Sequence, residues 1–63
     1  MTGTIKSYGP MNYGFVTANG VDFFFMDRDC DFIPERGMTV VFEPIKTEKG
    51  MRAKEVRNDA RDK

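Results

Sequence analysis

The chain contains no histidine and no tryptophan, and it has a single cysteine, Cys30. One cysteine cannot form an internal disulfide, and without histidine the chain lacks the ligand set of a typical zinc site. It also has no nucleophile motif and no phosphate-binding glycine loop, so its residues argue against an enzyme. We therefore expect no catalytic residue, no metal ion and no cofactor.

The sequence also lacks any long hydrophobic run and any stretch similar to a signal peptide. A membrane-spanning helix needs about 20 consecutive apolar residues, so no membrane segment is expected. A free cysteine without a secretion signal is typical of a reducing compartment. The cytoplasm is therefore the expected location.

What the chain does contain is enough apolar material for one small core, since 40% of its 63 residues are hydrophobic. Its net charge is zero, but the charges are unevenly distributed. Residues 1–45 hold three basic and six acidic side chains, a net of −3, whereas residues 46–63 hold seven basic and four acidic ones, a net of +3. The zero total argues against a strong nonspecific binder of nucleic acid, but the basic C-terminal part can still supply local phosphate contacts.

Short β-prone segments alternate with turn signals, at a spacing typical of a small all-β barrel or sandwich. Strands are predicted at residues 3–8, 12–18, 21–26, 38–43 and 51–56, although the last segment is compatible with a helix on propensity alone. Residues 27–37 are polar and contain Pro34 and Gly37, which predicts a loop with room for one helical turn. Residues 1–58 should form the domain, and residues 59–63 a charged, disordered tail.

Two features predict how the strands are connected. Asn19-Gly20 lies between two apolar segments, and this pair favours a type I′ hairpin because both central positions of that turn need a positive φ. Pro44 follows the fourth predicted strand and indicates an edge or a bulge there, because proline has no N–H to donate.

The sequence VDFFFM at residues 21–26 raises the question of which phenylalanines are buried. Successive side chains of a strand point to opposite faces, so Phe23 and Phe25 share one face while Phe24 and Met26 share the other. The predicted inward-facing set is Ile5, Val16, Phe23, Phe25, Val40 and Phe42. The opposite, outer face then carries Tyr13, Phe15, Phe24 and Met26 on two neighbouring strands. Such a patch indicates a binding surface, unless a loop or a second chain covers it.

Six short motifs in order make the chain resemble the bacterial cold-shock proteins. They are GTIK at residues 3–6, YGFV at 13–16, DFFF at 22–25, GMTVVFE at 37–43, KG at 49–50 and AKEV at 53–56. The resemblance covers residues 3–57. It implies an all-β fold, a five-stranded antiparallel Greek-key barrel of the OB type, that binds single-stranded RNA or DNA.

The resemblance also implies a set of site residues. The family's base-stacking aromatic positions correspond to Tyr13, Phe15 and Phe24, and a family lysine beside them corresponds to Lys6. The family tryptophan corresponds to Ser7 by direct count, or to Tyr8 if the alignment slips by one residue. Phe32 corresponds to an aromatic residue of the family's loop after the third strand. The family histidine and the phenylalanine after it correspond to Met26 and Asp27.

Two functions remain open from the sequence. The first is weak, low-specificity binding of single-stranded nucleic acid, with bases stacked on the outer aromatic residues and phosphates contacted by Lys6, Lys49 and Arg52. The second is a cold-shock-like barrel that no longer binds nucleic acid and acts through protein contact or a strand-exchanged homodimer. The acidic series Asp27, Asp29 and Asp31 favours the second. Salt dependence separates the two, because phosphate contacts weaken as salt rises whereas apolar contacts do not.

Overall fold

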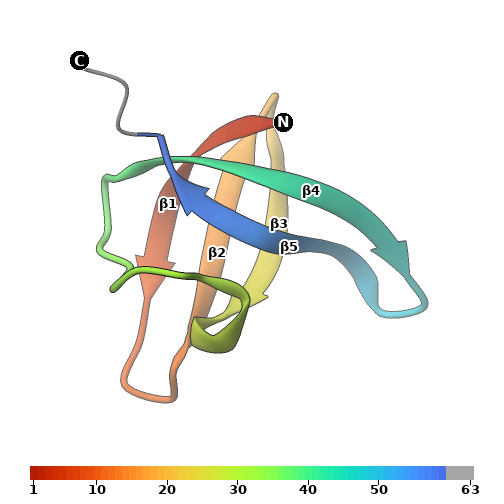
Figure 1. Ribbon diagram of the computed structural model, residues 1–63. Helices are drawn as coiled ribbons and strands as arrows, with labels where there is room; N and C mark the ends of the chain where they lie inside the picture. The colour runs from red at the N-terminus through yellow and green to blue at the C-terminus, as the bar shows by residue number, and fades with distance from the viewer. Residues whose placement is uncertain (60–63) are drawn as a thin grey trace.

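The computed structural model describes residues 1–59 and shows a small β-barrel with one arm that extends from it (Figure 1). Its elements are β1 (Thr2–Tyr8), β2 (Tyr13–Ala18), β3 (Val21–Met26), the short 3₁₀ helix η1 (Asp27–Asp29), β4 (Thr39–Thr47) and β5 (Gly50–Asn58). The predicted all-β fold, its five strands and the single helical turn in the loop are confirmed. In the segment that sequence propensity left open, β5 is a strand because it pairs with β4 along its length.

The strands close into a barrel in the order β1-β2-β3-β5-β4, consistent with an OB fold. Four of the five pairs are antiparallel, as predicted, but β3 pairs with β5 in parallel at Phe24 and Arg52. The parallel pair has a simple reason. Directions cannot alternate all the way around a closed ring with an odd number of strands, so one neighbouring pair must run the same way. The prediction of a wholly antiparallel barrel is wrong at this one pair.

β4 is longer than predicted and continues through Pro44 to Thr47. Its pairing with β1 runs from Thr39 to Val41, and beyond that point β4 pairs with β5. Pro44 therefore lies where β4 is an edge strand on one side, as its missing N–H requires. The second half of β4 and the first half of β5 form the arm that extends from the barrel in Figure 1.

The β2–β3 hairpin sets the register that positions the outer side chains. Asn19 and Gly20 have φ angles of 53° and 78°, so the predicted pair of positive φ values is confirmed. The register aligns Phe15 with Phe24 and Val16 with Phe23. Paired residues of an antiparallel sheet project to the same face, so this hairpin places rings on both faces of the sheet.

The core lies inside the barrel and contains the inward-facing set predicted by parity. Its buried side chains are Ile5, Val16, Ala18, Phe23, Phe25, Val40, Phe42, Ala53 and Val56.

In residues 1–59 no helix is long and apolar enough to cross a membrane. Asp59 donates its backbone N–H to the Thr39 carbonyl at 3.0 Å, so backbone pairing reaches the first residue of the predicted tail. The remaining predicted tail, residues 60–63, lies outside the described residues.

Candidate functional site

The outer faces of β2 and β3 carry four large side chains, Tyr13, Phe15, Phe24 and Met26, which we call the aromatic platform. Tyr13 is paired with Met26 and Phe15 with Phe24 in the strand register, so all four project from the same side of the sheet. Tyr13 and Phe15 are 40% and 37% exposed, and Phe24 and Met26 are half-buried. The predicted division of the three consecutive phenylalanines between core and surface is confirmed.

Phe24 is the centre of the aromatic platform. Its ring centroid lies 5.5 Å from that of Tyr13 and 5.9 Å from that of Phe15, with the Phe15 ring edge-on. The guanidinium carbon of Arg52, which is the β5 partner of Phe24 in the parallel pair, lies 5.5 Å from the Phe24 centroid. These contacts hold the rings in one arrangement without removing the two outer ones from solvent.

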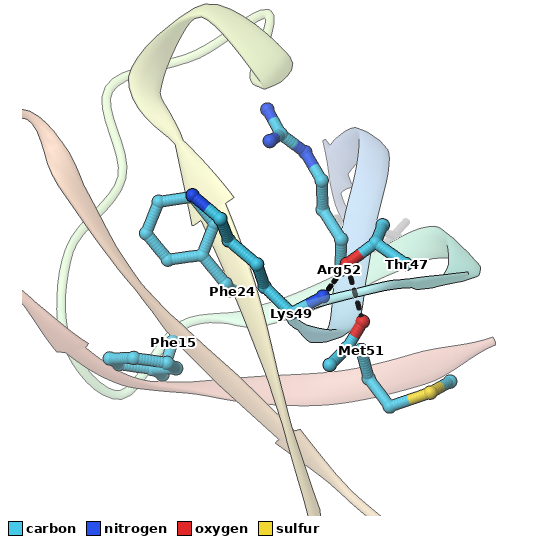
Figure 2. A pocket seen from close by; sticks show the side chains of 7 residues that line it. Phe15, Phe24, Thr47, Lys49, Met51 and Arg52 are labelled. Atoms are coloured by element: carbon cyan, nitrogen blue, oxygen red, sulfur yellow. Dashed lines mark hydrogen bonds between the residues drawn. The ribbon is translucent and has the colours of Figure 1, made fainter.

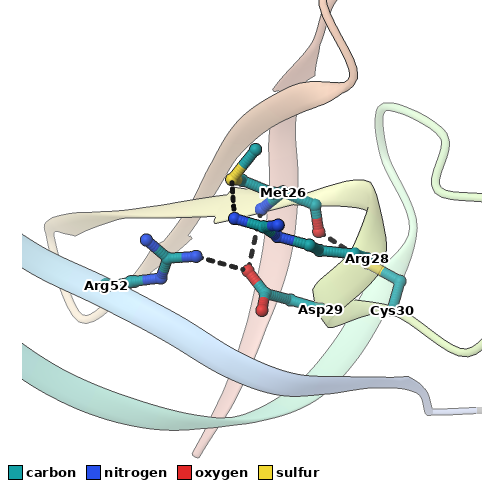
Figure 3. A network of polar contacts seen from close by, with 5 residues as sticks. All are labelled: Met26, Arg28, Asp29, Cys30 and Arg52. Carbon is teal, nitrogen blue, oxygen red and sulfur yellow. Dashed lines mark hydrogen bonds and ion pairs between the residues drawn. The ribbon is translucent and has the colours of Figure 1, made fainter.

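Arg52 is fixed by an ion pair as well as by the Phe24 ring. Its Nη2 donates to Asp29 Oδ2 at 3.2 Å, and the same carboxylate oxygen accepts the backbone N–H of Met26 at 3.0 Å (Figure 3). The Arg52 and Asp29 side chains are only 27% and 10% exposed, so this pair is better shielded from salt than a surface pair. The Arg52 Nε is buried and has no hydrogen-bond partner among residues 1–59. Arg52 therefore lies beside the platform, but Asp29 already neutralises its charge.

Lys6 is also paired with an aspartate. Its Nζ donates to Asp22 Oδ2 at 2.9 Å, which links β1 to β3 across the outer face of β2. The hydrogen bond from Lys6 holds the pKa of the Asp22 carboxyl below its usual value, so the carboxylate is ionised at neutral pH. Asp22 is two residues from Phe24 on the same face of β3, so this pair lies at one end of the platform.

Two predicted site residues lie away from the platform. Tyr8 is paired with Gly14 and its ring stacks on Phe25 at 6.0 Å, so it packs against the core. The register of β1 shifts between Ile5 and Ser7, and as a result Ser7 is the residue opposite Phe15. Burial raises the pKa of the Tyr8 hydroxyl, with a smaller contribution from Asp27. Phe32 is partly buried and also packs against the core.

A groove of about 390 Å³ lies between the aromatic platform and the tip of the β4–β5 arm (Figure 2). Phe15 and Phe24 line it from the platform, and Thr47, Lys49, Gly50, Met51 and Arg52 line it from the arm. The lining includes two cations and no carboxylate. Lys49 and Arg52 were predicted as site residues, but Thr47 and Met51 were not. Their place beside the platform depends on the arm, which continues past Pro44, where the predicted fourth strand had ended.

Cys30 is a free cysteine and is half-buried. Burial raises the pKa of the Cys30 thiol to about 11, with further contributions from nearby aspartates, so this thiol is protonated at neutral pH. Within residues 1–59, no group of three or more His, Cys, Asp or Glu side chains could hold a metal ion. Of the acidic series, Asp29 has a structural role through Arg52 and Met26, which the sequence analysis did not assign.

Comparison with protein-family models and with curated protein sequences found no match to this chain.

Proposed function

We propose that this protein binds single-stranded RNA or DNA weakly and with little sequence preference, in the manner of a divergent cold-shock protein. The observation that carries the proposal is the aromatic platform, in which Tyr13 and Phe15 stay exposed around Phe24 on one face of a barrel. Every nucleobase has a π-face, so stacking on such rings tolerates any sequence, and each stacked base contributes about 1–3 kcal/mol. The cytoplasm remains the expected location.

The ion pairs explain why the proposed binding is weak. Single-strand binders usually combine stacking with a basic track for the phosphates. Here Lys6 and Arg52 both border the platform, but Asp22 and Asp29 neutralise them. A phosphate that approached either cation would have to compete with a carboxylate already in contact. We therefore expect binding that depends more on bases than on phosphates, with a shallower salt dependence than three free cations would give.

The Phe15→Ala and Phe24→Ala variants test this proposal. Each should weaken binding of a short oligothymidine by about 5- to 150-fold, the equivalent of one lost stacking contact, while the domain stays folded. Titration can be followed by NMR or by tyrosine fluorescence, since Tyr13 is on the platform whereas Tyr8 packs against the core. Ile33→Ala is the matched control, because Ile33 is a large apolar residue that is 82% exposed outside the platform. Wild-type protein that shows no shifts at platform residues at high oligonucleotide concentration would contradict the proposal.

A second variant tests the role of Asp22. Asp22→Asn removes the charge that holds Lys6 and should make this lysine available to a phosphate. The affinity for oligothymidine should rise, and the slope of log affinity against log salt should steepen by about 0.7. Asp31→Asn, on an exposed loop residue, removes the same charge without freeing Lys6. If both substitutions raise the affinity equally, Asp22 does not restrain Lys6. The same conclusion follows if the double variant Asp22→Asn, Lys6→Gln keeps the full gain in affinity of Asp22→Asn alone.

Contact with a protein is a second candidate function, and the same ion pairs favour it. Once Lys6 and Arg52 are neutralised, the platform is an apolar face with little net charge, which suits an apolar protein surface or a second copy of this chain. Sedimentation over a range of protein and salt concentrations distinguishes this candidate, because apolar self-association persists at high salt. The strand-exchanged homodimer expected from the sequence stays a prediction that the same experiment tests.

A further inference from the structure

The loop between η1 and β4 presents the most exposed large apolar side chain of residues 1–59. Ile33 is 82% exposed, although its neighbours in sequence pack inward: Phe32 is half-buried against the core and Pro34 is buried. The far end of the loop is tied to β1, because the Gly37 N–H donates to the Ile5 carbonyl at 2.8 Å. Ile33 is therefore held out into solvent by a loop that is anchored on both sides of it. We call residues 31–35 the Ile33 loop.

The Ile33 loop is also acidic. Asp31 and Glu35 stand two residues before and two residues after Ile33, and both are exposed. Neither makes an ion pair with any residue in the described part of the chain. A single exposed apolar residue is ordinary on a protein surface, but one that is held between two free carboxylates is the complement of an apolar site with a basic rim.

The groove beside the arm is a site of that kind. Its lining includes three apolar or aromatic side chains, Phe15, Phe24 and Met51. It also includes two cations, Lys49 and Arg52, and no carboxylate. Asp29 is paired with Arg52, whereas the Lys49 ammonium group makes no ion pair with residues 1–59. In Figure 2 the Lys49 side chain extends from the turn of the arm in the direction of the Phe24 ring, so this free cation lies beside the apolar wall.

From these two complementary surfaces we infer that the Ile33 loop docks in the groove of a second copy of this chain. The inference rests on the second candidate function, contact with a protein, and names the segment that makes the contact. In Figure 1 the loop runs from η1 away from the arm and joins β4 on the side of the barrel opposite the arm tip, so it does not fill the groove of its own chain. In the docked pair Ile33 packs against the apolar wall. The carboxylate of Asp31 or Glu35 then contacts Lys49.

The contact is heterologous, because a loop of one copy meets a groove of the other. Two copies can exchange both contacts, or each copy can offer its loop to one neighbour and its groove to another. In both arrangements the loop covers Phe15 and Phe24, the rings proposed to stack bases. Self-association and oligonucleotide binding therefore compete for the groove, and each should weaken the other.

Two variants with different defects test the inference when they are mixed. Ile33→Asp alters the loop and leaves the groove intact, whereas Lys49→Glu reverses a charge of the groove and leaves the loop intact. In sedimentation velocity, Ile33→Asp alone should self-associate about 10- to 150-fold more weakly than the wild type, the equivalent of one buried isoleucine, and Lys49→Glu alone should also be weaker. A one-to-one mixture should restore association, because the loop of the Lys49→Glu protein meets the groove of the Ile33→Asp protein. Met11→Ala is the matched control and should associate like the wild type, since Met11 is 72% exposed and lies outside both surfaces.

The outcomes separate this inference from both candidate functions. Wild-type protein that stays monomeric at about 1 mM would overturn the inference together with self-association as a function. Association that Ile33→Asp does not weaken, or that mixing does not restore, overturns the inference alone, because contact between two platforms does not need Ile33.

Oligothymidine adds an independent readout, since it should dissociate the wild-type oligomer. If the oligonucleotide binds and the oligomer persists, the loop does not occupy the groove and the inference is wrong. If the oligonucleotide does not bind, the nucleic-acid proposal fails, while the mixing experiment still decides the inference. Ile33→Ala remains a control for oligonucleotide binding at protein concentrations at which the chain is monomeric.

Discussion

The Phe25→Ala variant should be largely unfolded at 25 °C. Phe25 is completely buried. It is paired with Gly14 on β2, and its ring stacks on the ring of Tyr8. Truncation of a buried phenylalanine costs about 3–5 kcal/mol, because the lost transfer energy is joined by the cost of the cavity. A domain of 63 residues has a total stability of roughly 3–9 kcal/mol at typical values per residue, so one such loss consumes most of it. Urea denaturation followed by circular dichroism measures the effect.

Phe24→Ala is the matched control for this prediction, since it makes the same chemical change one position earlier. Phe24 is half-buried, and its truncation removes two ring contacts and one contact with Arg52, which together amount to about 1.5–4 kcal/mol, less than the loss expected for Phe25. The variant should therefore fold but bind oligothymidine poorly, whereas Phe25→Ala should fail at the earlier step. Similar losses of stability in the two variants would refute the division of these rings between core and platform.

The alternation of side chains along β2 and β3 was sufficient to predict the platform. The period of a strand is two residues, so once Asn19-Gly20 fixed the hairpin register, the face of every ring followed. The same argument predicted the buried set from Ile5 to Phe42. Local rules of this kind depend only on neighbours in sequence and on one turn.

The charge state of the platform could not be predicted in this way. Arg52 and Asp29 are 23 positions apart, and they meet only because β5 returns in parallel beside β3. The Lys6–Asp22 pair depends on a third strand lying between its members. Parity places Asp22 on the same face of β3 as Phe24, but it does not say which cation reaches the carboxylate. The ion pairs changed the expected binding mode from one with several phosphate contacts to one dominated by bases.

The position of Tyr8 could not be predicted from the sequence either, because it depends on an irregularity in the pairing of β1 with β2. A one-residue slip in β1, which the sequence left open, would bring Tyr8 to the tryptophan position of the cold-shock family. The structure does contain an irregularity between Ile5 and Ser7, but it directs Ser7 toward the face of Phe15 and Tyr8 toward Phe25. A bulge moves every later side chain of a strand to the other face, and its position depends on how closely the neighbouring strand approaches. Here β1 can approach β2 closely because Gly14 has no side chain to meet the backbone of Ser7 and Tyr8.

Gly14→Ala should destabilise the domain severely, by at least about 3 kcal/mol. A Cβ at this position would overlap the Ser7 carbonyl oxygen and would lie 2.9 Å from both the Ser7 carbonyl carbon and the Tyr8 Cα. All three are backbone atoms, so no side chain can rotate away to relieve the clash, and β1 must move from β2. That movement would break the pairing of Tyr8 with Gly14 and disturb the stacking of Tyr8 on Phe25. Urea denaturation of the variant measures the loss.

Gly9→Ala provides the comparison that separates sterics from the general effect of replacing glycine. A Cβ at Gly9 would meet no atom of residues 1–59 within 4 Å, and Gly9 does not have a positive φ. This variant should be as stable as the wild type or slightly more stable, because alanine restricts the unfolded chain. If Gly14→Ala proved as stable as Gly9→Ala, β1 and β2 could not approach as closely as the structure shows. The assignment of Ser7 to the outer face and of Tyr8 to the core would then be lost, and Tyr8 would again become a candidate for the platform.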